Sequence, residues 1–475
     1  MMNRSHRLKF AFLTLASCAL VALSGTTAFC ADETPAPVAT TQEASIQAGE
    51  QKTDIQKAGA AQPAVKVTLR DSIAELFSTH DRIKAAEAAV ASASHMSDRA
   101  RGAWYPRLNA VVDGGHEDIR KPTDPASTSK WRNVQTLSAA QTVYDFGGTT
   151  GGINQAEGIR KESLAKLDMI RQEVSLQGVS AYLGLIRTRE MLRYALRSEE
   201  NIKRLSGMQE ALVERGVGLS YEELQIKAQL SQSQAHRINI ERAYTNARNN
   251  YKSVYGTDLT EAQIDSLILP SLPQKNMPGS LDEAVAKALD GSPALIELQQ
   301  ALQTKKGDLE VRESAMFPKV EAVAETMRKE NDQGDAGIRS EQRYGLQVSY
   351  NLFSGYRDVD NIRAAKSDIT SVRKSLLDRR RTVEERVRNA WNDILTLKKT
   401  IALYENQANI TWAYLELVKK KKAMGGEVGI TEIITGERDY INATSSKVTS
   451  EIEHITAAYM LLNQMGLITP DIVEN

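Results

Sequence analysis

Cysteine is almost absent from this 475-residue sequence: only Cys18 and Cys30 occur, both within the first 31 residues. If that segment is removed on export, the mature chain has no thiol, which excludes disulfides and cysteine nucleophiles. Aromatic residues make up only 5% of the chain, which is few for a globular core of this size. Lys plus Arg and Asp plus Glu balance at 60 each, so no large net field points to nucleic acid, and no nucleic-acid partner is expected.

Patterns of catalysis and metal binding are also missing from the sequence. No serine lies in a Gly-x-Ser-x-Gly turn. The histidines after residue 31 are scattered without metal-ligand spacing: His80, His95, His116, His236 and His454. The glycine-rich stretch 147–152 lacks the Gly-Lys-Ser/Thr of a phosphate loop and is expected to be a flexible strand-to-helix junction. We therefore expect no enzyme, no cofactor and no metal site.

The N-terminus has the order of a secretory signal peptide, which we predict over 1–31. Basic residues come first, an apolar run covers 10–23, and small residues lead to Ala31, so cleavage is expected after Cys30 or Ala31. Leu15-Ala16-Ser17-Cys18 resembles a lipoprotein box, but the apolar run continues past Cys18, so lipidation there stays an alternative. Residues 32–66 lack apolar periodicity and read as a disordered leader.

No later segment approaches 18 uninterrupted apolar residues, so a mature chain that crosses a membrane must do so with β-strands. The stretch 343–353 has the pattern of such a strand, since its apolar and polar side chains alternate with a period of two. A half-buried strand of a soluble sheet gives the same pattern. We predict a lipid-facing side made of Tyr344, Leu346, Val348, Tyr350 and Leu352.

The rest of the chain contains one structural unit twice. The first repeat, 67–268, is predicted to hold a helix over about 68–103, strands at about 105–116 and 133–146, a long helix over 153–214, a tip turn at 215–220 and a return helix. After a proline-containing linker, 269–280, the second repeat, 281–467, holds a helix to about 317, strands at about 317–330 and 343–353, a long helix over 356–424, a tip turn at 425–431 and a return helix. A tail, 468–475, closes the chain.

Three pairs of landmarks show that the repeat is a duplication. Pro106 and Pro318 are 212 residues apart, Tyr144 and Phe353 are 209 apart, and Gly218 and Gly429 are 211 apart. Each long helix would extend about 90 Å, too long for a compact domain. Four strands are too few to close a membrane barrel, so the pattern indicates that several chains associate.

On these features the sequence resembles the TolC family of outer-membrane channels over about residues 67–467. The resemblance rests on the duplicated unit, Trp104-Tyr105-Pro106-Arg107-Leu108, the strand ends Val143-Tyr144-Asp145-Phe146-Gly147 and Leu352-Phe353-Ser354-Gly355, and the tip turns. It implies a mainly α fold with a membrane β-barrel: a homotrimer with a twelve-stranded barrel in the bacterial outer membrane and a twelve-helix tunnel in the periplasm. It also implies a periplasmic adaptor protein and an inner-membrane ABC or proton-driven transporter as partners.

The resemblance further implies that the adaptor binds the tip turns. Those positions are Val217, Gly218 and Leu219 in the first turn and Val428, Gly429 and Ile430 in the second. Glycines at these places can also serve turn geometry alone.

Some members close the tunnel with paired aspartates just after the second tip, and this sequence has none there. Glu432 and Glu437 are the candidate gate carboxylates, with solvated helix surface as the alternative.

The predicted function is thus an export channel for type I protein secretion or multidrug efflux. The alternative is a periplasmic coiled-coil adaptor or scaffold, which would need one dominant hairpin and compact β-domains rather than two equal units.

Overall fold

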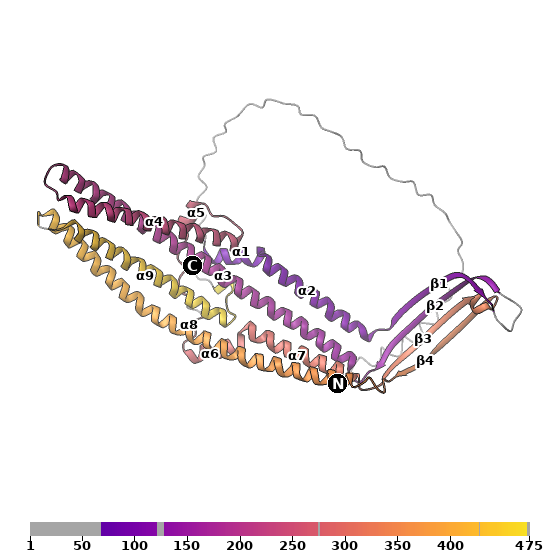
Figure 1. Cartoon of the computed structure of the whole chain (residues 1–475). Helices are drawn as coiled ribbons and strands as arrows, with labels where there is room; N and C mark the ends of the chain where they lie inside the picture. Colours follow the sequence, from indigo (N-terminus) through magenta and orange to yellow (C-terminus); the bar gives the residue numbers. More distant parts are fainter. Residues whose placement is uncertain (1–67, 121–127, 274–275, 427, 473–475) are drawn as a thin grey trace, which may run out of the picture. The chain divides into compact units, whose positions relative to one another are not determined.

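The computed structural model describes residues 68–120, 128–273, 276–426 and 428–472 (Figure 1). The predicted signal peptide, the leader, the lipidation site at Cys18 and the last residues of the tail lie outside the described residues. No helix among the described residues is long and apolar enough to cross a membrane.

The first predicted helix is two helices. α1 (Leu69–Thr79) begins at Thr68, whose hydroxyl accepts a hydrogen bond from the N–H of Asp71, and α2 (Asp81–Arg101) follows after a break at His80. His80 is extended, and its Nδ1 accepts a hydrogen bond from the N–H of Arg82, as an N-cap does. The prediction of one helix was wrong because the apolar stripe continues through the break.

The corresponding helix of the second repeat is broken in the same way. α6 (Leu281–Gly291) is capped by Ser280, and α7 (Pro293–Ser314) starts directly after Ser292. Ser292 has ψ 118°, the extended conformation that a following proline favours. The duplication therefore extends to a helix break that the apolar pattern does not reveal.

The long helices of the two repeats have equal lengths. α3 (Gly148–Glu214) and α8 (Arg357–Ala423) contain 67 residues each, and the return helices α4 (Ser220–Tyr255) and α9 (Ile430–Gln464) contain 36 and 35. The flexible junction predicted at 147–152 is wrong: only Gly147, with φ 98°, lies before the helix, and residues 148–152 are already helical. At about 1.5 Å per residue, α3 and α8 each extend about 100 Å.

The two hairpins pack against each other through α3 and α9 (Figure 1). α4 packs on α3, and α8 packs on α9, so α4 and α8 lie on the two outer sides of this layer of helices. α2 and α7 pack along α3 over its half that begins near the strands.

The four strands form one antiparallel sheet in the order β1-β2-β3-β4 (Figure 1). They are β1 (Arg107–Ile119), β2 (Thr128–Tyr144), β3 (Lys319–Glu330) and β4 (Ile338–Ser349). β2 begins five residues before its predicted start because Thr128–Arg132 pair with β1, although this stretch is polar. β4 likewise begins before its predicted start at about 343, since Ile338–Ser340 pair with the end of β3.

The main core lies where the short helices cross the middle of the long ones. It contains fully buried side chains from both repeats, including Leu76, Tyr182, Leu295, Val387 and Tyr459. The C-terminal segment is part of it: Gln172 donates to the carbonyl of Ile468 and accepts from its N–H, both at 2.9 Å. Asn463 also donates to the carbonyl of Gln172, so the start of the predicted tail is held against α3.

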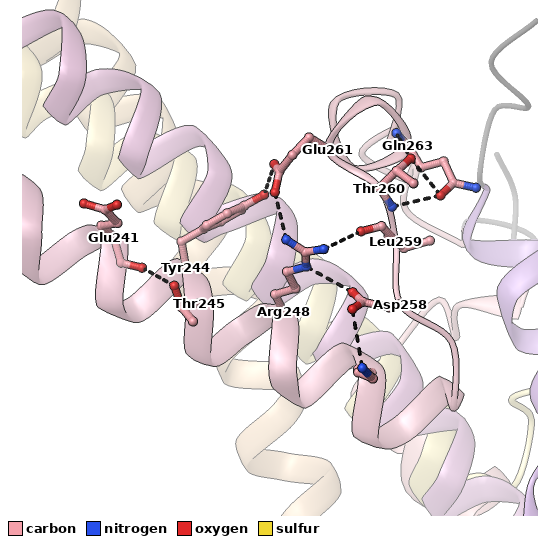
Figure 2. A network of polar contacts seen from close by, with 10 residues as sticks. Glu241, Tyr244, Thr245, Arg248, Asp258, Leu259, Thr260, Glu261 and Gln263 are labelled. Carbon is pink, nitrogen blue, oxygen red and sulfur yellow. Dashed lines mark hydrogen bonds and ion pairs between the residues drawn. The ribbon is translucent and has the colours of Figure 1, made fainter. Parts of the chain in front are cut away.

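A short helix, α5 (Glu261–Asp265), follows α4 and was not predicted. Figure 2 shows how Arg248 of α4 holds this connection: it donates to Asp258 at 3.0 Å, to Glu261 at 2.9 Å and to the carbonyl of Leu259 at 3.1 Å. Tyr244 donates to Glu261 at 2.7 Å, and Thr260 and Gln263 form a capping box. Most of these contacts are exposed, so they order the connection more than they stabilise the fold.

Candidate functional site

The pairing register gives the sheet two chemically different faces. Because neighbours across an antiparallel sheet share a face, Leu108, Ala139, Ala324 and Tyr344 form one row on the same side. We call this side the apolar face; toward the helices it carries Leu108, Ala110, Val112, Leu137, Ala139, Val320, Ala322, Ala324, Tyr344, Leu346 and Val348. At its other end it carries Arg328 and Glu330.

No other part of the described chain covers the apolar face. Tyr344 is 83% exposed, and Leu346 and Val348 are also exposed. Tyr350 and Leu352 are exposed as well, but β4 ends at Ser349, so the prediction that they belong to the strand was wrong. They lie in the junction before α8, where the alternation continues in sequence but none of the described strands pairs with them.

The opposite side of the sheet, the polar face, is rich in charge. Its residues alternate with those of the apolar face and include Arg107, Asp113, Glu117, Arg132, Glu321, Glu325, Lys329, Glu341 and Arg343. Arg132 contacts Asp113 and Asp332, and Lys329 lies 3.3 Å from Glu341. A sheet with one uncovered apolar face and one charged face fits an environment with lipid on one side and water on the other.

Aromatic side chains gather where the strands meet the long helices. Phe146 stacks on Phe317 with ring centroids 4.9 Å apart and meets Tyr144 edge-on at 4.7 Å. In the second repeat Phe353 packs against Tyr356 at 5.6 Å. Such a cluster at one end of an apolar band is typical of the interface between lipid and water.

The first tip turn closes α3 with a Schellman motif. Gly216, with φ 73°, donates to the carbonyl of Val213, and the N–H of Val217 donates to the carbonyl of Leu212. The predicted contact residues Val217 and Leu219 are 78% and 53% exposed. Gly218 is tightly enclosed, since a Cβ there would lie 2.8 Å from the Val213 nitrogen.

The second tip turn repeats this motif with Gly425 and Gly426, which donate to the carbonyls of Lys422 and Lys421. Gly429 is open: a Cβ there would meet only Thr431, at 3.9 Å. Val428 packs beside the cluster of Leu415, Val418 and Ile433. Ile430 is buried with Ile226 and Ile434, so of the predicted contact residues this one serves the packing of the two hairpins instead.

The two candidate gate carboxylates lie in different surroundings. Glu432 is exposed and accepts a hydrogen bond from Tyr414 at 3.2 Å. Glu437 is only 5% exposed and accepts a hydrogen bond from Asn201 of α3. The alternative of solvated helix surface is therefore wrong for Glu437, which joins the two hairpins; sequence periodicity does not reveal this because the partner lies on another helix.

An apolar stripe on the outer side of α8 was not singled out from the sequence. It consists of large exposed side chains spaced by seven or eight residues: Leu395, Leu403, Ile410 and Leu417. α4, on the other outer side, carries exposed Leu224 and Ile238. The spacing is a usable sequence signal, since seven-residue steps mark a helix-packing seam.

Comparison with known proteins identifies the group to which this fold belongs. The family model of outer membrane efflux proteins matches residues 73–257 and 284–435, one segment in each repeat. The chain belongs to the outer membrane efflux protein family. Its place is therefore the bacterial outer membrane, from which the long hairpins extend into the periplasm, and it is a channel of the efflux and secretion class.

Individual relatives agree with this assignment. The chain is 21% identical to the outer membrane efflux protein BepC of Brucella suis over 418 residues, covering 86% of this chain and 88% of that protein. It is 22% identical to the protein CyaE of Bordetella pertussis over 377 residues, covering 77% of each. The CmeC outer membrane channel of Campylobacter jejuni has the same fold, with a TM-score of 0.75 and 13% identity over 84% of this chain and 85% of that one.

Among the residues that the structure describes, no group of His, Cys, Asp and Glu could hold a metal ion. The surfaces described above that remain as candidates for function are the two faces of the sheet, the tip turns and the outer sides of α4 and α8.

Proposed function

We propose that the protein is the outer-membrane channel-tunnel of a tripartite export system, acting as a passive conduit for multidrug efflux or type I protein secretion. Three copies would form the conduit, and its partners would be a periplasmic adaptor and an inner-membrane ABC or proton-driven transporter. The observation that carries this proposal is the four-stranded sheet with an uncovered apolar face and a charged face. In a trimer the apolar face would meet lipid, and the polar face would line a water-filled pore.

The edges of the sheet support closure by several copies. β1 and β4 each pair on one side only within the described chain, so their outer backbone groups lack strand partners. Unpaired backbone groups are costly in lipid, and pairing β4 of one copy with β1 of the next removes the cost. Three four-stranded sheets make a twelve-stranded barrel.

The outer sides of the helices support the same arrangement. The apolar stripe on α8, from Leu395 to Leu417, would pack against Leu224 and Ile238 of α4 in the next copy. Such head-to-tail contacts close into a ring when the rotation between copies closes.

The fold does not favour the alternative of a periplasmic coiled-coil adaptor or scaffold. An adaptor would have one dominant hairpin, whereas this chain has two of equal length, each attached to a pair of strands.

Adaptor binding is proposed at the tip turns through Val217, Leu219 and Gly429, which are the accessible ones among the predicted contacts. Small and apolar groups at the end of a long hairpin allow another helical hairpin to approach closely. Gly218 and Val428 would shape these turns, and Ile430 would support them from within.

Site-specific photo-crosslinking in cells tests this proposal. A photoreactive residue at Leu219 or Gly429 is expected to capture the adaptor encoded with the export system. The same residue at exposed Asp335, in the β3–β4 turn, is the matched control and is expected to capture none. If neither tip position captures an adaptor while the channel is present in the outer membrane, the tip assignment is wrong.

A further inference from the structure

The turn between β3 and β4 has a defined structure. The N–H of Asn331 donates to the carbonyl of Gly337, and the N–H of Gly337 donates to Oδ1 of Asn331, both at 3.0 Å. Asn331 and Gln333 adopt positive φ angles of 51° and 57°, which are uncommon for residues other than glycine. We call residues 331–337 the strap, because these bonds close it into one unit.

The strap does not continue the line of its own strands. Its 3-10 turn, η4 (Asp332–Gly334), contacts β1 and β2 on the other half of the sheet. Asn331 donates to the carbonyl of Trp131 at 3.1 Å, and Asp332 accepts from Nε of Arg132 at 2.5 Å. The strap therefore leans across the sheet toward β1.

Arg132 fixes the side on which the strap lies. Arg132, Asp113 and Glu117 all occupy the polar face in the register of β1 and β2. Arg132 contacts Asp113 and lies 3.6 Å from Glu117, so one guanidinium joins two carboxylates of β1 to Asp332 of the strap. The strap is thus folded over the charged face.

The contact depends on charge. The Asp332 side chain is only 8% exposed, and besides Arg132 its cationic neighbour is Lys329 at 4.0 Å. A buried carboxylate that loses its main partner is strongly disfavoured, and here it can return to water only if the strap moves away. Arg132 therefore supplies the charged contact that holds the strap on this face, beside the hydrogen bond from Asn331 to Trp131.

We propose that the strap narrows the outer mouth of the pore, and that breaking the Arg132–Asp332 pair opens the mouth to larger solutes. This inference rests on the proposed function, because the polar face lines a pore only in the closed assembly. Three straps, one from each copy, would then form a constriction independent of the tunnel tips.

The test measures access to the pore from outside the cell. Gln347, exposed on the polar face near the tunnel end of β4, is replaced by cysteine as a reporter in the full-length protein. Intact cells are treated with a small membrane-impermeant methanethiosulfonate, or with a maleimide on a long polyethylene glycol chain. The ratio of the bulky to the small labelling rate reports how wide the mouth is, and the chain without the reporter gives the background.

We expect Arg132→Gln and Asp332→Ala to raise this ratio, and the charge swap Arg132→Asp with Asp332→Arg to lower it again. Asp332 lies in the turn and not in a strand, so Asp332→Ala should leave strand pairing intact. This variant therefore still tests the contact if Arg132→Gln fails to assemble. Arg343→Gln removes one exposed cation of the same face without touching the strap and is the matched control; its ratio should not change.

Two outcomes would contradict the proposed role of the strap. One is an equal labelling ratio in the parent, Arg132→Gln and Asp332→Ala; the other is a rise of the ratio in Arg343→Gln as large as that in Arg132→Gln. Failure of the proposed function gives a different result. In that case even the small reagent does not label the reporter from outside in any background.

Discussion

At the residue scale, glycine occupies the positions of the two tip turns for different physical reasons. Gly216 and Gly425 supply the positive φ of the Schellman motifs, and Gly218 leaves no room for a side chain. Gly429 has an ordinary φ of −64° and open space around it, so turn geometry does not require glycine there. The close approach of the proposed adaptor would account for glycine at this position, and so would its place as the N-cap of α9.

Gly429→Arg is therefore the cleanest test at the tips. We expect the trimer to assemble normally in the outer membrane while export falls strongly, because the new side chain points into open space where the adaptor would bind. Export is measured as dye efflux or protein secretion, and trimer yield is measured on the same membranes. Gly429→Ala is the control and should export normally; full export by Gly429→Arg would exclude the contact.

His454 predicts a dependence of stability on pH. It is 8% exposed on α9, and burial, together with the charge of Lys398, lowers its pKa below 6.5. Below pH 6.5 the unfolded chain protonates His454 more readily than the folded chain does, so the free energy of unfolding falls as the pH falls. Above that pH, His454 is neutral in both states and the free energy of unfolding does not depend on its titration.

Replacement of His454 by Gln should reduce this acid sensitivity. Comparing thermal unfolding midpoints at about pH 8 and about pH 5.5, we expect a smaller decrease in the variant than in the parent. Replacement of the exposed His95 by Gln serves as the control. Equal decreases in the parent and the His454 variant would show that protonation of this side chain does not limit stability.

At the scale of elements, α3 and α7 pack with their backbones almost in contact. A Cβ on Gly307 of α7 would lie 2.5 Å from the nitrogen of Gln155, and one on Gly158 of α3 would lie 2.6 Å from Thr304. The contact ties each strand pair to the helices, because α7 leads into β3 and α3 follows β2.

Two alanine substitutions should have opposite effects on stability. Gly307→Ala forces α3 and α7 apart and is expected to destabilise the fold by about 1–3 kcal/mol. Gly207→Ala, at an open position in the interior of α3, should stabilise by about 0.5–1 kcal/mol, since alanine loses less backbone freedom. Thermal unfolding of both variants checks the contrast, and a stabilised Gly307→Ala would show that the close contact is not maintained.

The sequence predicted the elements whose signal is local and periodic. The alternation around Tyr344–Val348 and the uninterrupted periodicity of the long helices are properties of neighbouring residues. The breaks at His80 and Ser292 were missed because the apolar stripe continues across them. The early starts of β2 and β4 were missed because pairing, not apolarity, makes Thr128–Arg132 and Ile338–Ser340 strands.

The functional positions divide in the same way. The tip turns are marked by glycines and could be located by sequence, but the burial of Ile430 and Glu437 depends on the other hairpin. The Arg132–Asp332 contact joins residues 200 positions apart, and the sequence around either residue does not indicate that they meet.

At the scale of the whole molecule, the two faces of the sheet should differ in whether they tolerate a charged side chain. If the apolar face meets lipid as proposed, Val348→Asp puts a carboxylate there and should destabilise the assembled barrel by less than the about 2–4 kcal/mol per site that Arg or Lys costs at the bilayer midplane, reducing trimer yield. Gln347→Asp, one residue earlier on the polar face, is the matched control and should assemble normally. Equal yields of both variants would argue that Val348 does not meet lipid.

A channel of this kind requires that copies associate through the open edges of the sheet and of the helix layer. The direct measurement is the mass of the protein extracted from outer membranes in mild detergent, by native mass spectrometry or light scattering. We expect release by detergent only and a trimer that dissociates on heating. A monomer, or release of the protein in soluble form by osmotic shock, would exclude a membrane barrel built from several copies.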